Sequence, residues 1–205
     1  KIKRYEQLGP VFSDLSVFNR NHINYIRTEN NIPADGKIIS FFDGSIGYAG
    51  TQSNNSYLKF LYLMDQLCRE KPDNTVIFKS KKGLEYAKNK LSITENSNEL
   101  FLNLSKHKNF IYANQQDLNS YEVISISDVV VTPPLGSVTY DSLSAKVRTL
   151  VFDPNLVGLD LDLSSFRVQN IHVGNMNELY NKIDFWLKLS NSEFEKYLYK
   201  YFDAF

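Results

Sequence analysis

The sequence has only one cysteine, no excess of charge of either sign and no long hydrophobic run. With Cys68 alone, the chain cannot form an internal disulfide or a cysteine metal cluster, which fits a reducing compartment. Its 23 basic residues equal its 23 acidic residues, which argues against a general binder of polyanions such as nucleic acid. No apolar run approaches the roughly 18 residues of a membrane helix, and the start of the chain has no signal-peptide pattern. We therefore expect a cytoplasmic protein that does not bind nucleic acid.

Signatures of metal sites and of hydrolases are missing as well. The three histidines, His22, His107 and His172, are not spaced as a metal triad or as an H-E-x-x-H pair. No G-x-S-x-G sequence marks a hydrolase nucleophile. We expect no metal ion and no other bound cofactor.

Short apolar runs alternate with helix-patterned segments along most of the 205 residues. Residues 38–42 and 128–132 are rich in apolar and β-branched residues and are followed by turn residues, which is typical of buried parallel strands. The predicted strands cover residues 38–42, 75–78, 109–112, 128–132, 149–152 and 167–173. The predicted helices cover residues 17–29, 56–70 with Ser56 as a candidate cap, 83–91, 96–106, 118–127, 137–146 and 192–205, and another follows a capping box at Asn175.

Repeated strand–helix units need right-handed crossovers and give a parallel sheet with helices on both faces. The predicted fold class is α/β, a Rossmann-like, doubly wound parallel sheet of about six strands over residues 36–190. Residues 1–35, which precede this domain, form a linker that includes a short helix. Residues 191–205 form a C-terminal helix. Ligands of such sheets lie beyond the carboxyl ends of the strands, near the switch point. The candidate loops are residues 43–55, 79–82, 112–116, 132–141 and 153–160.

The loop after the first strand has glycines spaced by three, at Gly44, Gly47 and Gly50. Glycine permits close approach of the backbone and positive φ, and both are useful around a phosphate. The pattern is neither the dinucleotide fingerprint G-x-G-x-x-G nor a P-loop. A surface loop without a ligand is an equal alternative.

Residues 133–141, Pro-Pro-Leu-Gly-Ser-Val-Thr-Tyr-Asp, are the most informative segment. A buried strand runs into a turn, and a helix then begins with Ser137 as the expected cap. The free N–H groups and positive dipole end of this helix suit a phosphate, and the hydroxyls of Ser137 and Thr139 can add donors. Asp141, one turn into the helix, could accept hydrogen bonds from a ribose diol. The alternative is that Ser137 only caps the helix and Asp141 only favours its positive end.

Three lysines, Lys79, Lys81 and Lys82, follow the second strand. Cations at this point face the same crevice and could neutralise a diphosphate. Lys79 is the chosen candidate because it is nearest to the end of the strand. Solvated lysines in a turn are the alternative.

Several segments together resemble a known family. They are residues 32–40, 126–132, 136–143 and 150–154, with residues 8–10 and Asp14 before them. Their order resembles the C-terminal, donor-binding half of GT-B glycosyltransferases over roughly residues 30–190. The groups most similar are bacterial surface-polysaccharide enzymes, which include CDP-glycerol glycerophosphotransferases and capsule biosynthesis proteins.

The resemblance implies a role for individual residues. A loop that contains Ser45 and Gly47 faces the donor phosphates and the acceptor, and Tyr112 approaches the nucleobase, partly through its backbone. Three departures are visible: Pro133-Pro134 replaces the usual polar pair, and an Asp replaces the common Glu at position 141. The histidine often found in the donor loop of relatives is not evident, although His107 is not far off in sequence. The donor-binding residues that the resemblance implies are Ser45, Gly47, Lys79, Tyr112, Gly136, Ser137, Thr139 and Asp141.

In GT-B enzymes the nucleotide-activated donor is held without an essential metal, and positive groups and helix dipoles stabilise the leaving phosphate. The resemblance therefore implies the donor-binding domain of a metal-independent glycosyltransferase or polyol-phosphate transferase in bacterial surface polysaccharide biosynthesis. The acceptor, a glycan or a lipid-linked glycan, and the general base usually belong to an N-terminal half that this chain is expected to lack. Asp43 is the only acid at a strand end that is placed to act as a base, and it is a weak candidate. The expected fragment is inactive alone, and the full-length protein could lie at the inner face of a membrane.

Two alternatives belong to other classes. One is half of a nucleotide-sugar epimerase of the same architecture. The other is a non-catalytic nucleotide-binding subunit that recruits a partner through the aromatic residues of segment 197–205, whose own alternative is packing onto the sheet.

Overall fold

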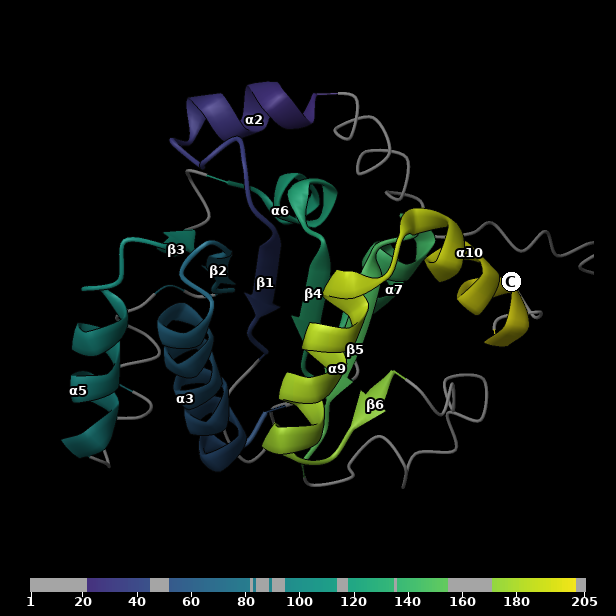
Figure 1. Ribbon diagram of the computed structural model, residues 1–205. Coiled ribbons are helices and arrows are strands. Elements are labelled where there is room, and N and C mark those ends of the chain that lie inside the picture. Colours follow the sequence, from purple (N-terminus) through teal and green to yellow (C-terminus); the bar gives the residue numbers. More distant parts are fainter. Residues whose placement is uncertain are drawn as a thin grey trace, which may run out of the picture.

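The computed structural model describes residues 22–44, 52–81, 83, 89, 95–113, 118–134, 136–154 and 171–201. In these residues the strands form one six-stranded parallel sheet in the order β3-β2-β1-β4-β5-β6 (Figure 1). The strands are β1 (Ile38–Phe42), β2 (Thr75–Lys79), β3 (Phe110–Ala113), β4 (Val129–Thr132), β5 (Arg148–Phe152) and β6 (His172–Val173). The chain first winds outward from β1 to β3 and then returns to β4 beside β1, so the switch point lies between β1 and β4.

Helices cover both faces of the sheet (Figure 1). One face is covered by α3 (Asn54–Glu70), α5 (Glu95–Leu104) and α9 (Met176–Lys188). The other is covered by α2 (Ile23–Glu29), α6 (Ser120–Ile126) and α7 (Ser137–Ser144). The last described helix, α10 (Asn191–Tyr201), packs on α9.

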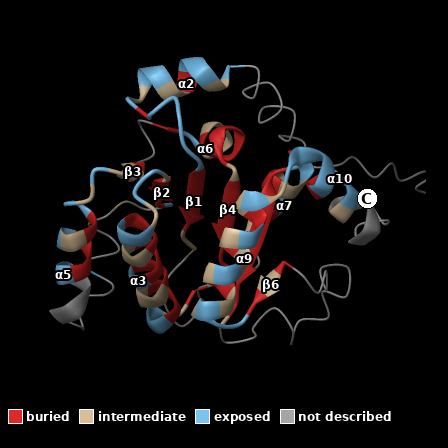
Figure 2. Cartoon of the chain, in the orientation of Figure 1, coloured by how far each residue is buried: buried red, intermediate tan, exposed pale blue. Residues whose placement is uncertain are grey.

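Two hydrophobic cores lie on the two faces, and the strands between them are buried almost throughout (Figure 2). Alternation along β1 divides its residues: Ile39 and Phe41 belong to the core under α3, whereas Ile38 and Phe42 belong to the core under α6. The first core is rich in aromatic rings, and the ring of Phe60 lies 5.5 Å from that of Phe41 and 5.4 Å from that of Phe152. The β4 run reads as continuous apolar residues because it is covered on both faces.

The predicted Rossmann-like parallel sheet is confirmed, and the first five predicted strands agree with the structure to within one residue at each end. The sixth strand is described only at His172–Val173, and residues 155–170 lie outside the described residues. Most of the helix predicted over 83–91 also lies outside them, as does the start of the helix predicted over 17–29.

Two predicted caps have different outcomes. Ser56 does not cap α3: Ser53 does, because its side chain accepts a hydrogen bond from the Ser56 N–H at 3.1 Å. The cap at Asn175 is confirmed, since its side chain accepts the Glu178 N–H at 2.8 Å. Candidate capping residues stand at four consecutive positions from Ser53 to Ser56, so the sequence pattern could not select the first of them.

The helix α2, which was predicted within the leading linker, is packed against the domain. Its Ile26 and the following Ile32 are buried in the core that α6 covers. Along the ranges that the structure describes, no helix has both the length and the apolar character that crossing a membrane requires.

A turn before β1 requires glycine, which gives a test of the fold. Gly36 has φ +92°, and a Cβ at this position would lie 2.3 Å from the backbone oxygen of Asp73. We expect Gly36→Ala to lower the free energy of unfolding by about 3 kcal/mol or more, from backbone strain and overlap together. Urea unfolding of the purified protein measures this change.

Gly83→Ala is the matched control, because Gly83 has φ +84° but nothing within 4 Å of its added Cβ. The free energy of unfolding of Gly83→Ala should fall by only about 1 kcal/mol, the part that comes from backbone conformation. Equal losses in the two variants would show that the contact with Asp73 has no effect on stability.

Candidate functional site

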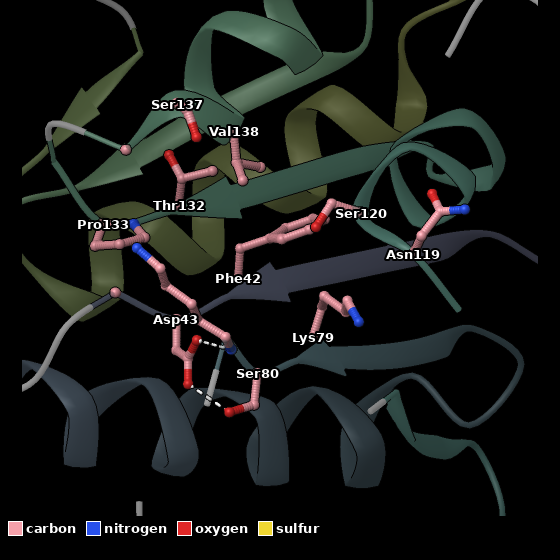
Figure 3. A pocket seen from close by; sticks show the side chains of 13 residues that line it. Phe42, Asp43, Lys79, Ser80, Asn119, Ser120, Thr132, Pro133, Ser137 and Val138 are labelled. Atoms are coloured by element: carbon pink, nitrogen blue, oxygen red, sulfur yellow. Dashed lines mark hydrogen bonds between the residues drawn. The ribbon is translucent and has the colours of Figure 1, made fainter. Parts of the chain in front are cut away.

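A cavity of about 440 Å³ opens at the carboxyl ends of β1, β2 and β4, beside the switch point (Figure 3). This is the edge at which the sequence predicted a ligand. The cavity lies on the face of the sheet that α6 and α7 cover, because its lining includes the residues that begin both helices. The lining consists of Phe42, Asp43, Gly44, Lys79, Ser80, Lys81, Asn119, Ser120, Thr132, Pro133, Gly136, Ser137 and Val138.

The start of α7 forms one wall of the cavity. Gly136 is the N-cap residue and Ser137 is the first helical residue, so the prediction of Ser137 as the cap is wrong by one position. No side chain caps this helix, and the first N–H groups of any helix have no partner within it. Ser137 and Val138 line the cavity, so it adjoins a helix start suited to an anion.

A pair of threonine hydroxyls joins this helix to the sheet. Thr132 ends β4 and lines the cavity, and its Oγ1 lies 2.7 Å from Oγ1 of Thr139. Both residues are buried. The Thr139 hydroxyl is thus directed at Thr132, and Thr139 is not among the lining residues. Thr132 was not singled out from the sequence, although it occupies the last position of the predicted strand.

Lysines at the end of β2 bring positive charge to the cavity. Lys79 is only 4% exposed, and it pairs in register with Phe42, so its side chain is on the cavity's face of the sheet. Lys81 also lines the cavity and is exposed. The third candidate in this turn, Lys82, lies outside the described residues.

Asp43 adds a carboxylate at the end of β1. Its Oδ2 accepts the Ser80 hydroxyl at 2.7 Å and its Oδ1 accepts the Lys81 N–H at 2.5 Å. Burial raises the pKa of the Asp43 carboxyl above its ordinary value, and these two bonds and the charges of Lys81 and Lys79 oppose the rise. The carboxylate therefore holds the turn that directly follows Lys79 and contains Lys81.

Two further candidates lie away from the cavity lining. Tyr112 pairs in register with Phe78, and the two rings pack at 5.9 Å in the core under α3, on the opposite face of the sheet from the cavity. Asp141 lies in the second turn of α7, where burial raises its pKa, and its charge adds to the effect of burial in raising the pKa of Tyr121 in α6. Ser45 and Gly47 lie outside the described residues.

Among the eight residues predicted to bind the donor, the structure places Lys79, Gly136 and Ser137 around one cavity. The lining residues that sequence reasoning did not single out are Phe42, Ser80, Asn119, Ser120, Thr132 and Val138. Asn119 could have been found from the Asn-x-x-Glu capping box that it forms with Glu122 at the start of α6. Where the structure describes the chain, no cluster of three or more His, Cys, Asp or Glu is arranged to hold a metal ion.

The raised pKa of Asp43 makes stability depend on pH in a defined direction. The folded state binds this proton more tightly than the unfolded state, whose carboxyl has the ordinary value near 3.8. The stability from this group is therefore complete below that value and is lost as pH rises through the folded-state pKa. Asp43→Asn removes the titration and keeps the side-chain shape.

We expect the free energy of unfolding of the wild type, minus that of Asp43→Asn, to fall as the pH rises from about 3.8 through the folded-state pKa of Asp43. Urea unfolding at several pH values measures the difference. A difference that increases with pH would mean that the hydrogen bonds from Ser80 and Lys81 dominate over burial.

Comparisons with known proteins agree with this geometry at the level of fold and family. The chain resembles the wall teichoic acid polymerase TagF, in crystals soaked with CDPG, with a TM-score of 0.59 and 19% identity over 94% of this chain and 44% of that one. It also resembles the N-terminal domain of Candida albicans trehalose-6-phosphate phosphatase, with a TM-score of 0.60 and 10% identity over 94% of this chain and 44% of that one. A third similar structure is the trehalose 6-phosphate synthase of Burkholderia multivorans, with a TM-score of 0.58 and 9% identity over 90% of this chain and 43% of that one.

The chain thus spans less than half the length of the solved structures that it resembles. At such identities the likeness shows the fold alone, one Rossmann-like half of GT-B-type chains. No curated protein matches the sequence. The family model for polysaccharide biosynthesis PFTS motif proteins matches residues 1–179. The chain therefore belongs to the polysaccharide biosynthesis PFTS motif family.

Proposed function

We propose that this chain is the donor-binding domain of a glycosyltransferase or polyol-phosphate transferase that uses a nucleotide-activated donor. The observation that carries the proposal is the cavity in which Lys79 and the uncapped start of α7 meet, at the switch point of a Rossmann-like sheet. A diphosphate needs positive groups and free N–H donors, and this cavity is lined by both. The family, whose description names polysaccharide biosynthesis, supports the reaction class.

The polarity of the lining supports a leaving phosphate in particular. Two lysines and the positive end of a helix dipole stabilise charge that develops on a departing diphosphate, without reorganisation at the moment of reaction. Ser137 supplies a hydroxyl donor beside them, and so does Thr132 when Thr139 is the donor in the bond between the two threonines. These are roles for the chain's own groups, and none of them requires a metal ion.

The residue at the N-cap of α7 supports a ligand at this helix start. Gly136 has no side chain that could cap the helix, which leaves the start of α7 open to a ligand.

A thermal-shift panel tests the proposal directly. CDP, UDP and GDP, together with CDP-glycerol and UDP-glucose, are added to the purified protein. A ligand at about a hundred times its dissociation constant adds roughly 2.7 kcal/mol of stability. If no nucleotide in the panel raises the melting temperature, the proposed function is wrong for this chain.

Replacement of the buried lysine provides a sharper prediction. Lys79→Gln should lower affinity for the nucleoside diphosphate that binds by about tenfold or more, because a charge-assisted contact is lost. Isothermal titration calorimetry measures the change. Lys106→Gln is the matched control. This exposed lysine lies between α5 and the start of β3, at the amino ends of the strands, whereas the cavity is at their carboxyl ends. Equal affinity in the two variants would remove Lys79 from the phosphate site.

Asp141 provides a separate test of the proposed ribose contact. Asp141→Asn should weaken CDP or UDP binding about tenfold if the carboxylate accepts ribose hydroxyls, and should leave inorganic pyrophosphate binding unchanged. Titration of both ligands into the same variant separates the two parts of the nucleotide. Unchanged CDP and UDP affinity would assign Asp141 to α7 and its packing against α6 instead.

A further inference from the structure

The cavity is not uniformly basic, because Asp43 is one of its lining residues together with the two lysines. Hydrogen bonds from Ser80 and Lys81 occupy one position on each carboxylate oxygen. A carboxylate has about four acceptor positions, so two remain for a ligand. Asp43 is half-buried, and its orientation is fixed from the protein side.

The charges divide the cavity into two ends. In Figure 3, Asp43 and Ser80 lie on one side and Ser137 and Val138 on the other, with Thr132 between them. A phosphate is attracted to the start of α7 and to Lys79 and Lys81, and it is repelled by the Asp43 carboxylate. The phosphate therefore belongs between the start of α7 and the lysines, and a different chemical group lies next to Asp43.

The groups around Asp43 limit what that neighbour can be. An anion is repelled by the carboxylate itself, and a cation is repelled by Lys79 and Lys81, whose charges already act on Asp43. An apolar group would leave the remaining acceptor positions without donors in a desolvated site. Neutral hydroxyl groups satisfy all three conditions.

We propose that Asp43 is a specificity-determining residue, whose carboxylate accepts hydrogen bonds from hydroxyl groups of the sugar or polyol that the donor carries. This inference rests on the proposed function and adds to it the orientation of the donor. The diphosphate lies against α7, and the transferred group lies at the end of β1.

The competing role for Asp43 is positioning alone. Its bonds to Ser80 and to the Lys81 N–H tie the turn after β2 to β1, and this turn directly follows Lys79 and contains Lys81. A purely positioning residue affects every phosphate ligand equally, because it acts through the lysines. A residue that contacts the transferred group affects only ligands that contain that group.

The test compares matched ligands by isothermal titration calorimetry: CDP with CDP-glycerol, and UDP with UDP-glucose. Asp43→Asn should weaken the glycerol- or glucose-bearing ligand about tenfold, and should leave the parent diphosphate unchanged or bound more tightly, since a repelling charge is removed. Ser80→Ala, which removes one bond of the turn but keeps the carboxylate, should retain the wild-type preference between the paired ligands. Melting temperatures confirm that both variants are folded.

Each other result overturns the inference. If Asp43→Asn loses affinity equally for the diphosphate and for its derivative, the residue acts through the turn or contacts the ribose. If affinity for neither ligand falls, Asp43 is not part of the binding site. If Asp43→Asn does not fold, the affinities of Asp43→Glu are measured for the same ligand pairs. A change in affinity for the derivative alone supports the inference, and an equal change for both ligands of a pair overturns it. Failure of the wild type to bind any of the four ligands is a distinct result, which refutes the proposed function itself.

Discussion

The parallel pairing of β1 with β2 on one side and with β4 on the other brings together the residues that line the cavity. In register, Phe42 lies beside Lys79, and Phe41 lies beside Val131, one residue before Thr132. Because all three strands run in one direction, the segments that follow them emerge at one edge of the sheet. Groups that are 53 positions apart in the sequence, Lys79 and Thr132, therefore line one cavity.

Polar groups within this apolar sheet are stable because they are paired locally. The hydroxyls of Thr132 in β4 and Thr139 in α7 are hydrogen-bonded to each other. The hydroxyl of Ser40 in β1 is hydrogen-bonded at 2.6 Å to that of Ser127, the residue that follows α6. Such buried pairs avoid the cost of desolvated hydroxyls and fix the angle at which each helix leaves the sheet. The position of the α7 start relative to β4 thus depends on one hydroxyl pair as well as on packing.

Much of the fold was predictable from the sequence, but less of the site was. The buried strands and the location of Lys79 at a strand end follow from local patterns, which identify the edge of the sheet but not the face. Tyr112 illustrates the limit: alternation places it beside Phe78 under α3, whereas its neighbour Ala113 pairs with Lys79 on the cavity's face. Thr139 shows the same limit on a helix, because the pairing of its hydroxyl with Thr132 depends on the rotation of α7 about its axis. Both outcomes required long-range register, which no single segment encodes.

Asp43 connects the stability of this cavity with its selectivity. A lysine as buried as Lys79 is costly unless negative charge lies near. Asp43 is one source of such charge, since the charge of Lys79 acts to lower the pKa of its carboxyl. The same carboxylate opposes any phosphate that enters, so the cavity gains a stable positive group at the expense of affinity for anions. An entirely basic cavity would bind every diphosphate tightly and release its product slowly. Under the proposed function, a mixed cavity favours donors that bring both a phosphate for the lysines and hydroxyl groups for the carboxylate.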